Sequence, residues 1–217
     1  MVEAYNPLDK FNLGRSVREA LLDSPVRELV DTADLVGAGV YALYYTGNFA
    51  PYTPIAAANA EGRYSQPIYV GKAIPKGGRK GGLGADAALG RAMRDRLSQH
   101  AATVQEAQNL DITHFFYRCL VVDDIWIPLG ENMMIETFKP IWNKVIDGFG
   151  NKTPGRGRVG QQRSPWDVLH PGRGFVKILG LGPGILSAEA IVERMQEFYR
   201  GIIPATPIGG GEGPDDT

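Results

Sequence analysis

The chain has 217 residues, of which 43% are hydrophobic and 22% are charged, and this composition is typical of a globular protein with a sizeable core. One cysteine, Cys119, excludes an intramolecular disulfide and a zinc site built on paired cysteines, and three histidines do not favour a multi-histidine metal site. No apolar run approaches the roughly 18 residues of a membrane helix, and the N-terminus has no signal-peptide pattern. We therefore expect a soluble protein of the cytoplasm that does not act at a membrane.

In chain order, hydrophobic spacing and the glycine and proline positions predict a succession of helices, strands and long loops. The expected elements are one or two short helices within 14–31 broken near Pro25, a strand at 40–46, a long loop at 47–66, a strand at 67–73, a glycine-rich basic loop at 75–84, a helix at 86–110, a strand at 113–122, a helix at 131–138, a second glycine-rich basic segment at 147–174, a strand at 175–179 and a helix at 187–199. This order predicts a small α+β domain with a short mixed or antiparallel sheet flanked by helices. A 20-residue loop at 47–66 is unusual inside a compact domain, which suggests a functional insertion.

The near-zero net charge conceals two basic blocks. Residues 63–96 hold eight bases against two acids, and residues 139–177 hold eight bases against two acids, whereas the first 38 residues are mainly acidic. Two basic blocks on a neutral protein indicate a localised anionic partner such as DNA, because neutralising phosphates releases counterions. Solvated surface loops with surplus lysine and arginine are the structural alternative.

Two pairs of residues could form a catalytic cluster. Tyr41 and Tyr69 lie on two expected strands and can share one face of a sheet, while Arg96 and His100 are four apart on an expected helix and project from one side of it. Glu131 begins another helix, and twelve residues later comes Asn143. Each of the six residues taken singly is explained by packing, solvation or helix capping, and only their joint order favours a site.

Two glycine-rich runs invite a nucleotide-binding interpretation that does not hold. The run 180–184 (GLGPG) has Ile185 where a dinucleotide fingerprint needs its third glycine, and too little chain follows for a βαβ unit. The run 77–82 (GGRKGG) lacks the GK[ST] ending of a phosphate loop. As a flexible basic loop, it suits contact with DNA phosphates.

The motifs Gly39-Val40-Tyr41, Tyr69-Val70-Gly71-Lys72, Arg96-x-x-x-His100, and the run from Glu131 to Asn143 resemble, in this order, those of the GIY-YIG nuclease superfamily. The resemblance covers residues 39–143, about half of the chain. Valine replaces isoleucine in both name motifs, and the 47–66 insertion lengthens the usual tight hairpin between them. The strings GFGNKTPGRGR and SPWDVLHPGRG, with the extra N-terminal segment, are similar to the type II restriction endonucleases of this superfamily, and most of all to those that cut CCGCGG.

The resemblance implies a role for each motif residue. Glu131 would be the single protein ligand of a Mg²⁺ ion, for which Mn²⁺ is expected to substitute, and Arg96 would hold the scissile phosphate. Tyr41 would orient or deprotonate the attacking water, with Tyr69 and His100 completing the network. Asn143 would brace the site through hydrogen bonds. Because the reference pKa of tyrosine is about 10, we expect Mg²⁺, Arg96 or His100 to lower that of Tyr41.

The resemblance also implies an organisation and a set of partners. We expect an N-terminal helical extension at 1–36, a nuclease core at 37–146 and a basic C-terminal extension at 147–205. The glycine-rich and polar composition of the last residues, not the resemblance, predicts a disordered tail at 206–217. A palindromic site is read most simply by a homodimer on double-stranded DNA. A cognate DNA methyltransferase would act in the same prokaryotic cytoplasm without being a stable subunit. The DNA-binding candidates are Lys72, Lys76, Arg79, Lys80, Arg156, Arg158, Arg163 and Arg173.

The function expected from the sequence is therefore Mg²⁺-dependent, site-specific cleavage of double-stranded DNA at a short GC-rich palindrome. Two alternatives remain open at this stage. One is a structure-specific repair nuclease or homing-type nuclease with the same fold. The other is a nucleic-acid-binding module that kept the fold without activity.

Overall fold

The computed structural model describes residue 6 and residues 9–74, 90–151 and 161–202. Its helices and strands, with the 3₁₀ turns labelled η, are α1 (Lys10–Asp23), β1 (Arg27–Glu28), β2 (Gly39–Tyr45), η1 (Ala50–Tyr52), α2 (Thr53–Asn59), η2 (Ala60–Gly62), β3 (Tyr69–Ala73), α3 (Ala92–Glu106), η5 (Ile112–His114), β4 (Phe115–Val121), η6 (Asp124–Trp126), α4 (Ile127–Phe138), α5 (Ile141–Lys144), α6 (Pro165–Leu169), α7 (Gly174–Ile178) and α8 (Ala188–Tyr199). The α+β class expected from the sequence is confirmed.

The four strands form one antiparallel sheet in the order β1-β4-β2-β3. Strand β2 lies inside the sheet with every residue buried, which explains its run of tyrosine and aliphatic residues. Its neighbour β3 is an edge strand among the described residues, and the two pair with Tyr41 opposite Gly71 and Leu43 opposite Tyr69. The long connection between β2 and β3 therefore does not prevent their pairing.

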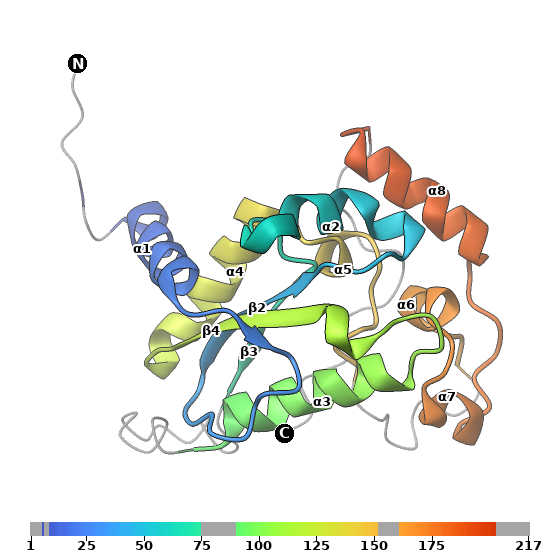
Figure 1. Ribbon diagram of the computed structural model, residues 1–217, viewed down its shortest axis with the longest axis horizontal. Helices are drawn as coiled ribbons and strands as arrows, with labels where there is room; N and C mark the ends of the chain where they lie inside the picture. Colours follow the sequence, from blue (N-terminus) through green and yellow to red (C-terminus); the bar gives the residue numbers. More distant parts are fainter. Residues whose placement is uncertain (1–5, 7–8, 75–89, 152–160, 203–217) are drawn as a thin grey trace.

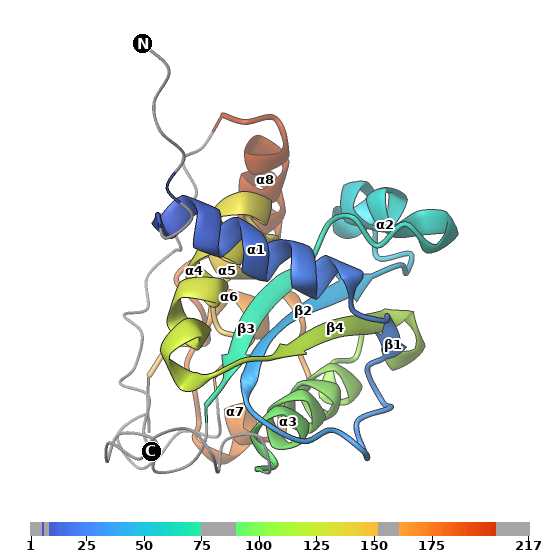
Figure 2. The same cartoon turned by 90° about the vertical axis from the view of Figure 1, so that its left-hand side faces the viewer.

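Alternation along β2 sends side chains into two separate layers. Tyr41, Leu43 and Tyr45 enter the larger hydrophobic cluster, whereas Ala42 and Tyr44 enter a smaller cluster with Leu21 of α1 and Met134 of α4. Helices α1 and α4 accordingly cover one face of the sheet, and α3 lies against the other with the C-terminal helices nearby (Figures 1 and 2).

The ends of the helices follow standard capping chemistry. Asp9, Ser164 and Ser187 cap α1, α6 and α8 by accepting hydrogen bonds from backbone N–H groups of the first turn. Pro128 lies in the first turn of α4, and this helix ends at Lys139, which adopts a left-handed conformation before Pro140.

Three sequence expectations for local structure were wrong. Residues 50–62 form η1, α2 and η2 instead of a long loop, because Thr53–Asn59 (TPIAAAN) combines proline in the first turn with three alanines. Residues 174–178 form helix α7 instead of a strand. After Pro25, residues 27–28 form strand β1 beside β4 instead of helix, whereas the single helix α1 agrees with the expected one or two helices.

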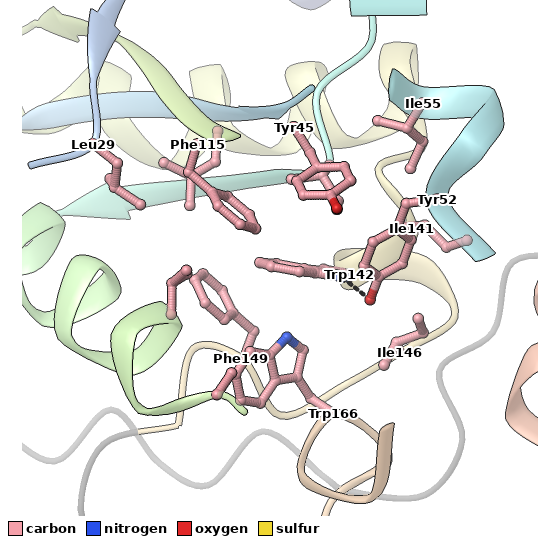
Figure 3. Close-up of a cluster of buried hydrophobic side chains, with 14 of the residues drawn as sticks. Leu29, Tyr45, Tyr52, Ile55, Phe115, Ile141, Trp142, Ile146, Phe149 and Trp166 are labelled. Atoms are coloured by element: carbon pink, nitrogen blue, oxygen red, sulfur yellow. Dashed lines mark hydrogen bonds between the residues drawn. The ribbon is translucent and has the colours of Figure 1, made fainter. Parts of the chain in front are cut away.

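The larger cluster joins the sheet to the C-terminal part of the chain (Figure 3). Trp142 and Phe149 meet Trp166 of α6, with ring centroids 5.8 and 5.4 Å from it. Ile191 and Met195 of α8 belong to the same buried cluster. The division of the chain at residue 146 stays a prediction, and the expected tail at 206–217 lies outside the described residues.

Candidate active site

The two motif tyrosines point to the same side of the sheet. Tyr41 of β2 lies opposite Gly71, and Tyr69 lies two residues before Gly71 on β3. Both side chains therefore project from the face of the sheet that α3 covers. Their ring centroids are 6.3 Å apart. The expectation that the tyrosines share a face is confirmed.

Gly71 provides the space in which the Tyr41 ring lies. A Cβ atom at this position would be 2.4 Å from the Tyr41 hydroxyl oxygen and 2.6 Å from Cζ, which is closer than real contacts allow. The glycine of the second name motif therefore permits the Tyr41 side chain to cross β3. Any larger residue would displace the hydroxyl group.

Helix α3 delivers His100 to these tyrosines. The Tyr41 hydroxyl and Nε2 of His100 are 2.7 Å apart, and the His100 ring lies 5.3 Å from the Tyr69 ring between centroids. His100 is 2% exposed, and burial, followed by the charges of Arg96 and Arg173, holds its pKa well below the usual value. The imidazole is therefore neutral, and its Nε2 can accept the Tyr41 proton in one tautomer or donate to the phenol oxygen in the other.

Arg96 lies one turn before His100 and interacts with both phenols. Burial alone would lower the pKa of Arg96, but the phenols of Tyr41 and Tyr69 outweigh it and raise that pKa. Its Nη2 also donates to the carbonyl of Gly150 at 3.2 Å.

Burial controls the protonation of both tyrosines. It raises the pKa of Tyr41 well above 10, with further increases from Tyr69 and Glu131, and the guanidinium of Arg96 only partly opposes this. Burial likewise raises the pKa of Tyr69. Arg96 lowers the pKa of Tyr41, as expected, but desolvation of a buried phenolate raises that pKa by more, so the net shift is upward.

Glu131 lies on helix α4 and contacts the second motif strand. Its Oε2 lies 2.9 Å from the Nζ of Lys72 on β3, with the two side chains 15% and 30% exposed. The charge of Glu131 contributes to the raised pKa values of Tyr41 and Tyr69, so the carboxylate lies within electrostatic range of both phenols. The site thus combines one carboxylate, one guanidinium, two phenols and a neutral imidazole.

Asn143 fixes the edge strand that carries Tyr69. Its side-chain oxygen accepts a hydrogen bond from the Val70 N–H at 2.8 Å, and its Nδ2 donates to the Val70 carbonyl at 2.8 Å. Because an edge strand has unpaired backbone groups, a side chain that supplies both partners acts as a short substitute strand. Asn143 is thus bound to the strand that carries Tyr69, and its bracing of a catalytic site stays a prediction.

A hard cation bound at Glu131 would have few protein ligands. Within the described ranges, no group of three or more His, Cys, Asp or Glu side chains could hold a metal ion. A single, partly exposed carboxylate that already attracts the ammonium of Lys72 fits Mg²⁺, which keeps several waters and commonly binds one or two carboxylates plus substrate phosphate.

The DNA-binding candidates divide into three groups. Lys76, Arg79, Lys80, Arg156 and Arg158 lie outside the described residues. Lys72 pairs with Glu131, and Arg163 is exposed. Arg173 was wrongly expected to contact DNA: it is 2% exposed, and its guanidinium binds Asp167 and backbone carbonyls. We leave it out of the DNA-binding set.

Sequence reasoning missed two residues beside the cluster. The Phe149 ring stacks on His100 with centroids 4.5 Å apart and planes inclined by 13°, and Gly150 supplies the carbonyl that Arg96 binds. The sequence feature that could have indicated these two residues is the run Gly148-Phe149-Gly150, an aromatic residue between glycines at the start of the second basic segment.

A model of the Eco29kI GIY-YIG domain matches residues 33–199, which are 167 of the 217 residues. The chain therefore belongs to this family of GIY-YIG nucleases, a family of type II restriction endonucleases. Among curated proteins, the search finds no relative that matches the chain. Within the part of the chain that the structure describes, no helix has both the length and the apolar character needed to cross a membrane.

Proposed function

We propose that this protein is a Mg²⁺-dependent, site-specific endonuclease that hydrolyses phosphodiester bonds in double-stranded DNA. The observation that carries the proposal is the hydrogen-bonded pair of Tyr41 and His100, with Arg96 interacting with both phenols and Glu131 in electrostatic range. Phosphodiester hydrolysis needs an aligned nucleophile and neutralisation of a more negative transition state. These side chains provide both requirements.

Arg96 supplies the fixed positive charge for the scissile phosphate, since a guanidinium suits the geometry of phosphate oxygens. Tyr41 orients the attacking water through its hydroxyl group, and the neutral His100 holds that hydroxyl by a hydrogen bond to Nε2 at 2.7 Å. The raised pKa of Tyr41 favours this hydrogen-bonding role over a standing phenolate. Tyr69 would complete the network around the water.

Glu131 would hold the Mg²⁺ ion, which when bound supplies a hard positive charge to a non-bridging phosphate oxygen. Mn²⁺ has the same preference for oxygen ligands and is expected to substitute. Lys72, beside the same carboxylate, would contact the DNA backbone. Lys76, Arg79, Lys80, Arg156, Arg158 and Arg163 complete the proposed DNA-binding set.

We further propose a short GC-rich palindrome such as CCGCGG as the recognition site, read by a homodimer in which each subunit cuts one strand. Arginine suits guanine because it can donate two hydrogen bonds to O6 and N7 in the major groove. A cognate methyltransferase would protect the same site in the prokaryotic cytoplasm that contains the DNA.

Digestion of a sequenced phage genome tests this proposal. With Mg²⁺ we expect discrete fragments whose ends share one sequence, and with EDTA no fragments. A continuous smear would contradict site specificity, and preferred cleavage of branched DNA would favour the structure-specific alternative. Binding of DNA without turnover in Mg²⁺ or Mn²⁺ would contradict the assignment as an enzyme.

A further inference from the structure

Arg173 and Asp167 form a buried ion pair beside residues 148–151, which follow α5 in the chain. The Nε of Arg173 donates to Oδ1 of Asp167 at 2.6 Å, and the hydroxyl of Ser164 donates to the other carboxylate oxygen at 2.7 Å. The side chains of Arg173 and Asp167 are 2% and 3% exposed. The Arg173 guanidinium also lies 4.7 Å from the ring centroids of both Trp166 and Phe175, which hold it in place.

The remaining donors of Arg173 bind the backbone of residues 148–151. Nη2 donates to the Gly148 carbonyl at 2.8 Å, and Nη1 lies 3.5 and 3.4 Å from the carbonyls of Phe149 and Asn151. One guanidinium therefore gathers three carbonyls of a four-residue segment. The planar fork of arginine can do this, whereas the compact ammonium of lysine cannot reach all of them in one geometry.

Two of these residues, Phe149 and Gly150, also contact the proposed catalytic cluster. Phe149 stacks on His100 and meets the Tyr69 ring edge-on, with centroids 5.0 Å apart. The Gly150 carbonyl accepts the hydrogen bond of Arg96. A Cβ on residue 150 would be 2.9 Å from the Tyr69 hydroxyl and 3.3 Å from Nη2 of Arg96, so the backbone itself packs against both groups.

We propose that Arg173 is a positioning residue: through residues 148–151 it fixes the guanidinium of Arg96 and the ring of His100 in the geometry that hydrolysis requires. This inference rests on the proposed function of the Arg96 and His100 cluster. Arg173 touches neither phosphate nor water in this role. Its effect passes through two contacts, the Phe149 stack and the Gly150 carbonyl.

A conservative substitution separates this role from simple support of the core. We expect Arg173→Lys to lower the single-turnover cleavage rate about 100-fold, because small misplacement of catalytic groups has effects of that order. The dissociation constant for the duplex, measured without a divalent ion, should change by less than about threefold, since the DNA-binding side chains remain.

The spectroscopic signature is the His100 ring. In the wild-type protein, the stacked Phe149 ring should shift the His100 ring proton signals upfield, and Arg173→Lys should move these signals toward ordinary values. A purely structural role for Arg173 would leave them unchanged in the folded molecules.

Leu29→Ala is the matched control. Leu29 is fully buried in the same cluster but follows β1, at the sheet edge opposite β3. It should lower thermal stability by leaving a cavity. We expect its cleavage rate per folded molecule and its His100 signals to remain those of the wild type. Equal rates per folded molecule in Arg173→Lys and Leu29→Ala would overturn the proposal.

Phe149→Leu decides the question should Arg173→Lys fail to fold, because it leaves the buried ion pair intact and removes the stack. We expect the same loss of rate and of the upfield shift, and an unchanged rate would contradict the proposal. The NMR readout does not depend on cleavage. Absence of cleavage in the wild type would therefore refute the proposed function, whereas unmoved His100 signals would refute the positioning role.

Discussion

At the scale of single residues, burial determines the chemistry of the site. Tyr41 is a neutral phenol and His100 is a neutral imidazole. For both groups, desolvation of the charged form is the largest influence on the pKa, and the neighbouring charges do not offset it. The pair, 2.7 Å apart, is therefore joined by a hydrogen bond between two neutral groups. The cation at Glu131 and the guanidinium of Arg96 are then the proposed sources of positive charge for the phosphate.

Gly71→Ala should impair catalysis by displacing Tyr41. The new Cβ would be 2.4 Å from the Tyr41 hydroxyl oxygen, so this group must leave His100 or the strand must move. We expect a fall in cleavage rate of about 100-fold and a loss of stability of about 1–3 kcal/mol. Single-turnover kinetics and thermal unfolding measure the two effects.

The matched control is Gly174→Ala, since no atom lies within 4 Å of a Cβ at position 174. It should keep the wild-type cleavage rate. Wild-type kinetics in Gly71→Ala would show that the Tyr41 position does not matter.

His170 should make the protein less stable in acid. Burial, followed by the charge of Arg173, lowers its pKa to about 3, whereas the unfolded-state value is about 6.5. Between these values the unfolded chain binds the extra proton, so the contribution of His170 is complete above pH 6.5 and is lost as the pH falls toward 3.

Urea unfolding at several pH values measures this effect. The slope of unfolding free energy against pH should fall in His170→Gln by up to about 1.4 kcal/mol per pH unit below pH 6. Because other groups titrate in this range, the difference between the two proteins is the quantity of interest. Equal slopes would contradict a neutral, buried His170.

At the scale of elements, the strands were easier to predict than the segments between them. The aromatic and β-branched runs at 40–46, 67–73 and 113–122 correspond to β2, β3 and β4, because such side chains suit a buried pleated surface. Helix α3 also followed from its four-residue spacing, although it begins at Ala92. Its face carries Arg96 and His100 to the tyrosines, as expected.

The failures have local physical causes. Two-residue strand β1 is too short to show any period, and its place depends on pairing with β4. The hydrophobic pattern of residues 175–179 (FVKIL) fits a strand and a helical turn equally well. Tertiary packing therefore determines that helix α7 forms. Phe149 and Gly150 were missed because contacts with His100 and Arg96 depend on a chain path that no local pattern encodes.

Asn143 should stabilise strand β3 through its two hydrogen bonds to the Val70 backbone. In Asn143→Leu, which keeps a side chain of similar size, the acceptor of the Val70 N–H and the donor to the Val70 carbonyl are both lost. We expect a loss of about 1–3 kcal/mol in unfolding free energy and faster exchange of the Val70 amide. Hydrogen exchange followed by NMR measures the second effect, and unchanged protection at Val70 would contradict the bracing role.

At the scale of the whole molecule, the catalytic face and the C-terminal part share one core. Trp142, Phe149 and Trp166 pack together, and α8 adds Ile191 and Met195 to the same cluster (Figure 3). The family match extends to residue 199, well past Asn143, the last of the proposed catalytic residues.

A chain that ends at residue 150 should therefore lack a stable fold. It would expose Trp142 and Phe149 and lose Arg173, which holds residues 148–151. Calorimetry should show no cooperative unfolding transition for this fragment, in contrast to the full chain. A cooperative transition with wild-type cleavage would instead support an independent nuclease core that ends near 146.

The central claim is that DNA cleavage takes place where Glu131, Arg96 and the two phenols converge. The most direct test is the single-turnover cleavage rate of Glu131→Gln in Mg²⁺, which keeps the size of the side chain and removes its charge. We predict a rate at least about 1,000-fold below that of the wild type, with duplex binding retained. Cleavage at the wild-type rate would place the chemistry elsewhere in the molecule.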